Sequence, residues 1–231
     1  MALIWPAQPM RDPDIFVTDF AEYAIGVQPF DWTSRWLNTG FTALVQTVSG
    51  SISGNALRWT KTTANSQLLS WNKVPTVANA EIVCRMRVIE ATSAPETFVR
   101  PCVRATGASG AENSYAVQPT KDPSGSGWNN SFIKQVAGAG AVIGTASFGP
   151  SPTFAINNWF WCRFRVIGTS LQRRAWWQGS SEPGTWDESI TDSAVTTAGW
   201  VGLRNTNVNP DCEIDFFAVA INGKTAPLGR R

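Results

Sequence analysis

The feature that most limits the fold of this chain is a series of short segments in which apolar and polar residues alternate. The clearest runs from Asn158 to Ile167 (NWFWCRFRVI). Its alternate positions are Phe160, Cys162, Phe164 and Val166 on one side, and Trp159, Trp161, Arg163 and Arg165 on the other. Because successive side chains of a strand point to opposite faces, the first set is predicted to face a core and the second to face outward.

The same alternation recurs along most of the chain. Ala80 to Ile89 (AEIVCRMRVI) places Arg85 and Arg87 opposite an apolar set. Further strands are expected at Ile15–Phe20, Phe41–Val48, Ala56–Thr60, Gln67–Trp71, Phe98–Ala105, Ser114–Gln118, Ser131–Val136, Ala141–Ser147, Leu171–Gln178, Trp200–Arg204 and Glu213–Ile221. No sustained helical stripe occurs. Many short strands between Gly, Pro, Asn and Ser clusters predict an all-β fold, with two antiparallel sheets packed as a jelly-roll sandwich.

Composition excludes several kinds of chemistry. The chain has 231 residues, 12 Trp and no His, which removes the Ser-His-Asp triad, the Cys-His dyad and every histidine-based metal site. A net charge of +2 does not indicate a nucleic-acid partner, which usually requires a clustered basic face. Arginines outnumber lysines 14 to 5, and a surface rich in Arg and Trp with few Lys is typical of contact surfaces.

The length suits one domain with a short extension. Residues 1–17 are apolar and interrupted by prolines, and we interpret them as an N-terminal arm, followed by a jelly-roll domain over residues 18–231. Leu3, Ile4 and Trp5 are the arm's candidate docking residues, because such side chains are costly to leave in water. The start of the chain does not resemble a signal peptide, and no stretch approaches the roughly 20 apolar residues of a spanning helix. We therefore expect synthesis in the cytoplasm and no insertion into a membrane.

The four cysteines are Cys84, Cys102, Cys162 and Cys212. Their wide spacing argues against a zinc ribbon. Four buried thiols in a reducing compartment are the favoured interpretation, and two disulfides are the alternative.

Several segments together resemble the concanavalin A-like (laminin G-like) jelly-roll domains of phage-encoded proteins. They are Asp19–Trp36 (DFAEYAIGVQPFDWTSRW), Trp159–Leu171 (WFWCRFRVIGTSL), Glu182–Trp186 (EPGTW), Ala198–Leu203 (AGWVGL) and Asp215–Ala220 (DFFAVA). The resemblance covers roughly residues 19–227. It implies the fold more firmly than the function, since this fold carries lectins, hydrolases, lyases and structural modules. Within it, Trp176 and Trp186 are predicted to pack against each other across the Glu182–Trp186 loop.

Laminarinase-type glycoside hydrolases share this fold and carry a strand of the pattern E-x-D-x-x-E or E-x-D-x-E. Glu213 and Asp215 match its first two acids, but Phe217 and Ala218 stand where the last acid belongs. Without that proton donor a retaining mechanism is incomplete, so we expect no catalysis. The resemblance also implies a possible structural calcium ion, for which Asp14, Asp19, Glu213 and Asp215 are the candidate oxygen ligands. No other cofactor is expected, and the alternative for these acids is pairing with arginines at the surface.

Two sets of residues are candidates for carbohydrate or protein contacts. Trp128, Asn129 and Asn130 follow a glycine-rich loop and could stack on a sugar ring and hydrogen-bond its hydroxyls. Trp159, Trp161, Arg163 and Arg165 form an outward stripe that suits a subunit interface, a glycan site or simple packing, with the interface favoured.

Together these features predict a non-enzymatic structural protein of a bacteriophage virion. Capsid decoration and a tail or fibre component are both open. The protein is expected at the virion surface, as a homo-oligomer for which a trimer is one option, in contact with other virion proteins and with a host surface glycan as a further partner. The alternatives are a soluble lectin-like carbohydrate-binding protein and a glycan-cleaving enzyme.

Overall fold

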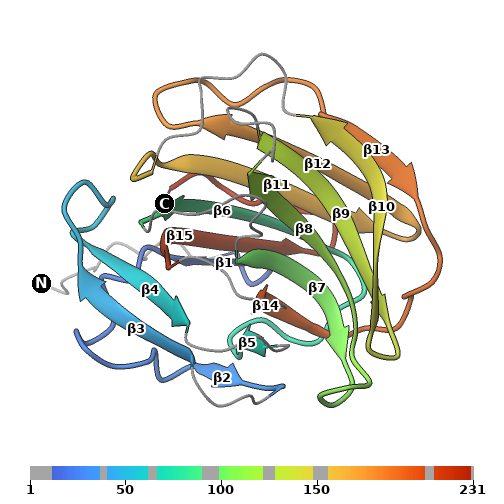
Figure 1. Ribbon diagram of the computed structural model, residues 1–231, viewed down its shortest axis with the longest axis horizontal. Helices are drawn as coiled ribbons and strands as arrows, with labels where there is room; N and C mark the ends of the chain where they lie inside the picture. The colour runs from blue at the N-terminus through green and yellow to red at the C-terminus, as the bar shows by residue number, and fades with distance from the viewer. Residues whose placement is uncertain are drawn as a thin grey trace, which may run out of the picture.

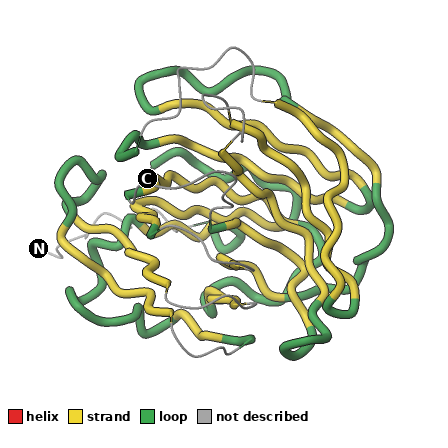
Figure 2. The backbone as a smooth tube through the Cα atoms, viewed as in Figure 1, coloured by secondary structure: helices red, strands yellow, loops and turns green. Residues whose placement is uncertain are grey.

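A computed structural model describes residues 12–36, 41–61, 67–89, 99–121, 128–147, 156–205 and 211–229. Within these ranges the secondary structure consists of strands, turns and loops (Figure 2). The described residues contain no helix long and apolar enough to cross a membrane. The strands form two antiparallel sheets, as the alternating pattern predicted (Figure 1).

Sheet A has eight strands. Seven follow the order β13 (Glu188–Thr191), β12 (Ser170–Trp177), β11 (Phe160–Ile167), β6 (Ala80–Val88), β15 (Cys212–Ile221), β4 (Asn55–Lys61) and β3 (Phe41–Thr47). The eighth, β1 (Ile15–Thr18), also pairs with β15. β15 therefore has β6 along one side, while β4 and β1 share its other side.

Sheet B has seven strands. Their order is β10 (Ala139–Ser147), β9 (Trp128–Val136), β8 (Asn113–Lys121), β7 (Arg100–Thr106), β14 (Trp200–Asn205), β5 (Gln67–Trp71) and β2 (Trp32–Ser34). Gly202 in β14 is required by the close approach of β5, because a Cβ there would lie 2.1 Å from the carbonyl oxygen of Leu69.

The two sheets enclose one large apolar core. Phe160, Cys162, Phe164 and Val166 of β11 all belong to it, which confirms the predicted inward set. Within this core, Trp32 and Trp71 stack with ring centroids 5.4 Å apart, and Phe217 lies edge-on to both. All four cysteines are buried and free, as the favoured interpretation predicted.

The predicted boundary of the N-terminal arm needs correction. Ile15, Phe16 and Val17 pair with Ala220, Val219 and Ala218 of β15 and so belong to sheet A. Ile15 and Val17 also pack against an apolar cluster on the outer side of that sheet. The part of the predicted arm from residue 15 onward is therefore a strand of the domain, while Leu3, Ile4 and Trp5 lie outside the described residues.

Candidate functional site

The outward stripe predicted on β11 lies on the outer face of sheet A. Trp161, Arg163 and Arg165 alternate there with the core residues of the same strand, and neighbouring strands add side chains of the same kinds. We call this surface the arginine–tryptophan face. Its members are Arg58, Arg85, Arg87, Trp159, Trp161, Arg163, Arg165, Arg174, Trp176 and Trp186, with Glu81, Glu182, Glu213 and Asp215 as their acidic partners.

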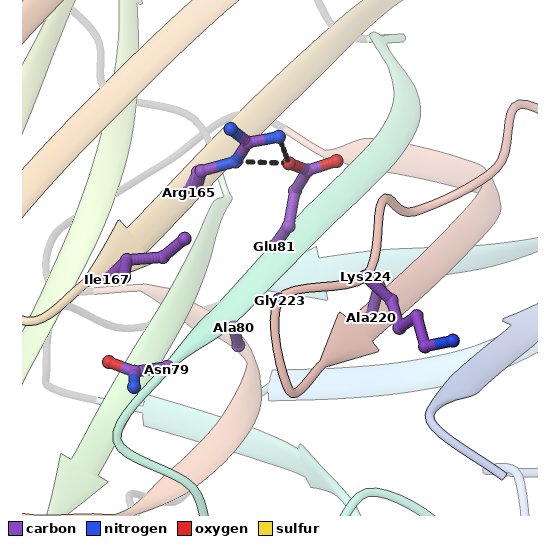
Figure 3. Close-up of a pocket in the computed structure, with 8 residues that line it drawn as sticks. All are labelled: Asn79, Ala80, Glu81, Arg165, Ile167, Ala220, Gly223 and Lys224. Carbon is purple, nitrogen blue, oxygen red and sulfur yellow. Dashed lines mark hydrogen bonds and ion pairs between the residues drawn. The ribbon is translucent and has the colours of Figure 1, made fainter.

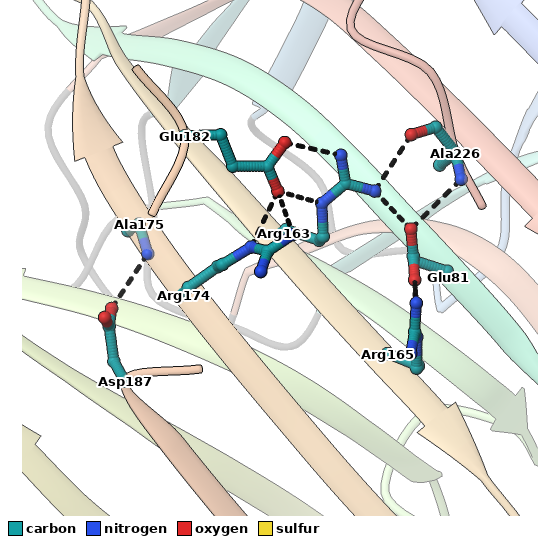
Figure 4. A network of polar contacts seen from close by, with 8 residues as sticks. All are labelled: Glu81, Arg163, Arg165, Arg174, Ala175, Glu182, Asp187 and Ala226. Atoms are coloured by element: carbon teal, nitrogen blue, oxygen red, sulfur yellow. Dashed lines mark hydrogen bonds and ion pairs between the residues drawn. The ribbon is translucent and has the colours of Figure 1, made fainter. Parts of the chain in front are cut away.

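Arg163 is the centre of one ion-pair network on this face (Figure 4). Only 3% of its side chain is exposed, and its guanidinium pairs with both Glu81 and Glu182. It also donates to the carbonyl of Ala226 at 2.9 Å, which ties the C-terminal segment to the sheet. Arg165 pairs with Glu81, and Arg174 donates to Glu182 at 2.6 Å through Nε. Three guanidinium groups thus share two carboxylates, and the guanidiniums of Arg163 and Arg174 hold the pKa of Glu182 below its usual value although burial opposes them.

A second network surrounds the start of β15. Glu213 is fully buried and pairs with Arg58 and Arg87, and Asp215 accepts from Arg85 at 2.9 Å. A β-bulge between Ile214 and Phe216 lets Asp215 also accept the backbone N–H of Ile52 at 2.9 Å. Burial raises the pKa of Asp215 to about 7, outweighing the nearby arginines, which lower it.

Aromatic rings lie against these guanidinium groups. The Trp159 ring has Arg85 at 4.7 Å and Arg87 at 4.5 Å from its centroid. The Trp186 ring has Arg165 at 5.0 Å and Arg174 at 4.5 Å. Such cation–π contacts fix the planar groups in place. The two networks hold six arginines and four carboxylates, and a fifth acid, Asp187, interacts electrostatically with Arg174, so arginines outnumber acids on this face.

The predicted pairing of Trp176 with Trp186 is not what the structure has. Trp176 instead stacks on Trp161, with centroids 6.0 Å apart and planes 7° from parallel. The two tryptophans are cross-strand partners in the β11–β12 register, which explains the stacking. Trp186 instead lies over the guanidinium groups of Arg165 and Arg174. Trp159 lies on the predicted side of its strand, but it is buried in a small cluster with Val48 and Ala56.

The four acids proposed as calcium ligands do not come together. Asp14 accepts from the Asn222 amide, Asp19 accepts the backbone N–H of Ala21, and the two acids of β15 pair with arginines. No cluster of three or more His, Cys, Asp or Glu suited to a metal ion occurs in the described part of the chain. The alternative weighed for these acids was pairing with arginines at the surface. Glu213 and Asp215 do pair with arginines, but both are fully buried, so the surface part of that alternative is wrong for them.

The predicted glycan set Trp128, Asn129 and Asn130 forms the start of β9 and is not part of a loop. Asn130 is 1% exposed, and its amide has no hydrogen-bond partner among the described residues. It lies two residues before the core residue Phe132, so strand alternation turns it toward the interior. This buried position corrects the prediction that Asn130 contacts a sugar. The side chains of Trp128 and Asn129 lie outside the described residues.

A small pocket lies at one end of the arginine–tryptophan face, between β6, β11 and the end of β15 (Figure 3). Glu81 and Arg165 face each other in it and form an ion pair, and Glu81 also pairs with Arg163. Lys224 at its rim pairs with Asp12 at 3.2 Å. Each charged side chain that lines the pocket thus already has an ion-pair partner.

Sequence reasoning missed part of this face. Arg58, Glu81 and Arg174 were not among the candidate residues, and Glu182 was noted only as the first residue of the Glu182–Trp186 segment. Glu81 had a usable signal, because it alternates in phase with Arg85 and Arg87 along one strand. Glu182 had none, since it reaches the face from a loop after β12.

No protein-family model and no curated protein matches this sequence. Solved structures with a similar fold include a conserved carbohydrate esterase from the Shiga toxin-encoding bacteriophage phi24B, at TM-score 0.54 and 19% identity over 83% of this chain and 90% of that one. They also include the CBM2 module of the evolved Dit of Lactobacillus casei BL23 phage J-1, at TM-score 0.52 and 14% identity over 91% and 96%.

A third similar structure is the exoplasmic/lumenal domain of VIP36, at TM-score 0.55 and 9% identity over 91% and 92% of the two chains. Identities this low are evidence for the fold alone. The fold of this chain is thus a lectin-like, two-sheet jelly-roll sandwich, and proteins of phages are among those that share it.

Proposed function

We propose that this protein is a non-enzymatic structural component of a bacteriophage particle, displayed at its surface as a capsid decoration or a tail or fibre part. Its jelly roll contacts neighbouring subunits through the arginine–tryptophan face, and the same face is available to glycans of the host surface. The occurrence of this fold in two phage proteins, one of them a carbohydrate-binding module by name, supports the phage and glycan parts of the proposal.

The observation that carries the proposal is the composition and rigidity of the arginine–tryptophan face. Trp and Arg are the residue types most enriched among those that dominate binding energy in protein interfaces. Here the guanidinium groups are already held by carboxylates and by indole rings, so little side-chain entropy remains to be lost on binding. The excess positive charge of the face favours an acidic partner surface.

The arrangement of the acids supports a non-enzymatic role. Glycoside hydrolysis requires two carboxyl groups flanking the substrate, one of them a proton donor. Glu213 and Asp215 are instead both engaged by arginines, and neither has a second acid at the expected later position of β15. The paired state of these carboxylates suits a structural role on the face.

Trp186 provides the test, because it is half-buried and lies over two arginines without being part of the core. Sedimentation velocity and glycan-array binding would be measured for the wild type, Trp186→Ala and the control Phe30→Ala. Phe30 is 82% exposed and precedes β2, in the other sheet. We expect wild-type self-association or glycan binding to weaken by about tenfold or more in Trp186→Ala, and to persist in Phe30→Ala.

Equal loss in the two variants, or no loss in either, would contradict the assignment of the face as the contact surface. Glycan binding by a protein that never associates with particles would favour a soluble lectin. Release of reducing ends from a polysaccharide panel, abolished by Glu213→Gln, would overturn the non-enzymatic assignment.

A further inference from the structure

A second arginine site lies on the opposite sheet, away from the arginine–tryptophan face. Arg100 is the first residue of β7 and Arg204 is the last but one of β14, and the two are direct cross-strand partners. Side chains at directly opposed positions of an antiparallel pair lie on one face, with Cβ atoms about 5 Å apart. The two positive charges are therefore neighbours at the ends of their strands.

Both side chains lie on the outer face of sheet B. Val99 and Leu203, which precede them in the chain, belong to the core between the sheets. The guanidinium of Arg204 lies over the ring of Trp36 at 5.3 Å from its centroid, and Trp36 belongs to a separate outer cluster with Cys102. The alternation of the strands thus turns the arginines away from the main core.

Arg100 lacks the compensation that other buried arginines have. Arg85, Arg163 and Arg173 each meet a carboxylate. Arg100 is 3% exposed, and the described residues supply it with neither a carboxylate partner nor a hydrogen-bond acceptor for Nε. A buried charge without a partner is destabilising, and a like charge beside it adds to the cost. Burial, together with the charge of Arg204, lowers the pKa of Arg100 to about 9.

Arg204 is held by neutral groups. Its Nη1 donates to the Ser114 hydroxyl at 2.6 Å and its Nη2 donates to the side-chain carbonyl of Gln135, while its Nε has no partner in the described part of the chain. The nearby acid Glu112 is occupied by the Gln135 amide at 3.2 Å and by the backbone N–H of Gly110 at 3.0 Å. Glu112 therefore orients Gln135, and it acts on Arg204 through its charge without a direct hydrogen bond. Two Nε donors on neighbouring strands remain unused.

We propose that Arg100 and Arg204 form a binding site for an oxyanion group, a carboxylate or a phosphate, carried by a ligand. Planar guanidinium groups match the geometry of both oxyanions and bind them through paired N–H donors. A bound anion would supply the missing countercharge to Arg100 and accept from the unused Nε donors. The carboxylate of an acidic sugar and a free phosphate share this chemistry, and the experiment separates them. The site is independent of the proposed function, because it uses the other sheet.

The test is thermal unfolding of the full chain titrated with sodium glucuronate, with inorganic phosphate and with neutral glucose, at constant ionic strength set by NaCl. We expect a saturable rise in Tm of roughly 5 °C or more at about 100 times Kd for at least one of the two anions, and none for glucose. Arg100→Met should lose the rise, and without anion it should be at least as stable as the wild type because an unpaired buried charge is gone. The control Lys73→Met removes an exposed cation that pairs with Asp31 and belongs to neither arginine site, and it should keep the rise.

A rise with glucuronate alone identifies a carboxylate ligand, and one with phosphate alone identifies a phosphate ligand. No saturable rise in the wild type with either anion overturns the proposal, and so does an equal rise in Arg100→Met. The wild-type titration decides the matter even if Arg100→Met fails to fold, and Arg100→Lys, which keeps the charge without the planar fork, should then retain a weakened response. A failure here leaves the test at Trp186 unaffected.

Discussion

Removal of the Arg163 guanidinium is expected to destabilise the protein strongly, because it is the shared centre of a buried network. Arg163→Met keeps the length and most of the apolar stem of the side chain while removing the charge. It would leave Glu81 with Arg165 and the backbone N–H of Ala226, leave Glu182 with Arg174, and free the carbonyl of Ala226.

The magnitude follows from burial. Breaking a buried ion pair by removing one partner costs about 3–5 kcal/mol. Since both carboxylates keep a second arginine, we expect a value near the lower end, about 3 kcal/mol. For a domain of this size each kcal/mol shifts Tm by about 2–4 °C, so Tm should fall by roughly 6–12 °C. Arg58→Met is the matched control: Arg58 is 40% exposed, Glu213 keeps Arg87, and a loss below about 1 kcal/mol is expected.

Urea unfolding at pH 7, followed by tryptophan fluorescence, measures both losses. The reasoning would be refuted if Arg163→Met lost no more stability than Arg58→Met. A second check uses Glu81→Gln combined with Arg163→Met: because the two groups interact directly, the double variant should lose less than the sum of the single losses.

Three further predictions concern other parts of the fold. Burial raises the pKa of Asp215 to about 7, above its value of about 4 in the unfolded chain, so protonation of Asp215 stabilises the folded state. This stabilisation is complete below about pH 4 and is lost as the pH rises through about 7. The difference in Tm, Asp215→Asn minus wild type, should therefore increase from about pH 4 to pH 8, and a constant difference would contradict this. Gly202→Ala should lower Tm by several degrees or prevent folding, because the added Cβ would meet the backbone of β5. Gly140→Ala is the control and should change stability by less than about 0.5 kcal/mol, because nothing lies within 4 Å of the added Cβ. Similar Tm values for the two variants would argue against the close approach of β14 and β5. The four buried thiols should react with a thiol reagent only after unfolding, and rapid labelling of the native protein would show that they are accessible.

Much of the fold could be predicted from local pattern. The alternation in β6 and β11 gave the strands, their inward sets and the outward arginines, because a two-residue period maps directly onto the two faces of a sheet. β2 (Trp32–Ser34) and β13 (Glu188–Thr191) were missed, because strands of three and four residues are too short to establish a period.

The candidate site was less accessible to sequence reasoning, because its contacts are long-range. Arg163 pairs with Glu81, which is 82 residues away, and Arg58 pairs with Glu213 at a separation of 155 residues. Such pairings depend on which strands become neighbours, and no local pattern specifies that. Arg104 is a similar case: it has a positive φ of 54° and its buried guanidinium donates to the carbonyls of Ala78, Val195 and Gly168, a role that nothing in its neighbourhood indicates.

The interpretation of the acids illustrates the same limit. The resemblance to concanavalin A-like domains singled out Glu213 and Asp215 as the first two acids of an incomplete catalytic pattern and as candidate calcium ligands. The structure adds the β-bulge and the arginines of β4 and β6 that surround them, and these convert the pair into part of an ion-pair network. Sequence could give the positions of the carboxylates, whereas their chemistry depends on partners contributed by other strands.

The most direct test of the proposed function is the location of the protein in particles. Particles would be purified by density gradient from a lysate of cells that carry the gene, then labelled with an antibody against the recombinant protein and viewed by electron microscopy. The proposal predicts labelling at a regular position on intact particles and co-sedimentation of the protein with them. Unlabelled particles, with the protein confined to the soluble fraction, would contradict it.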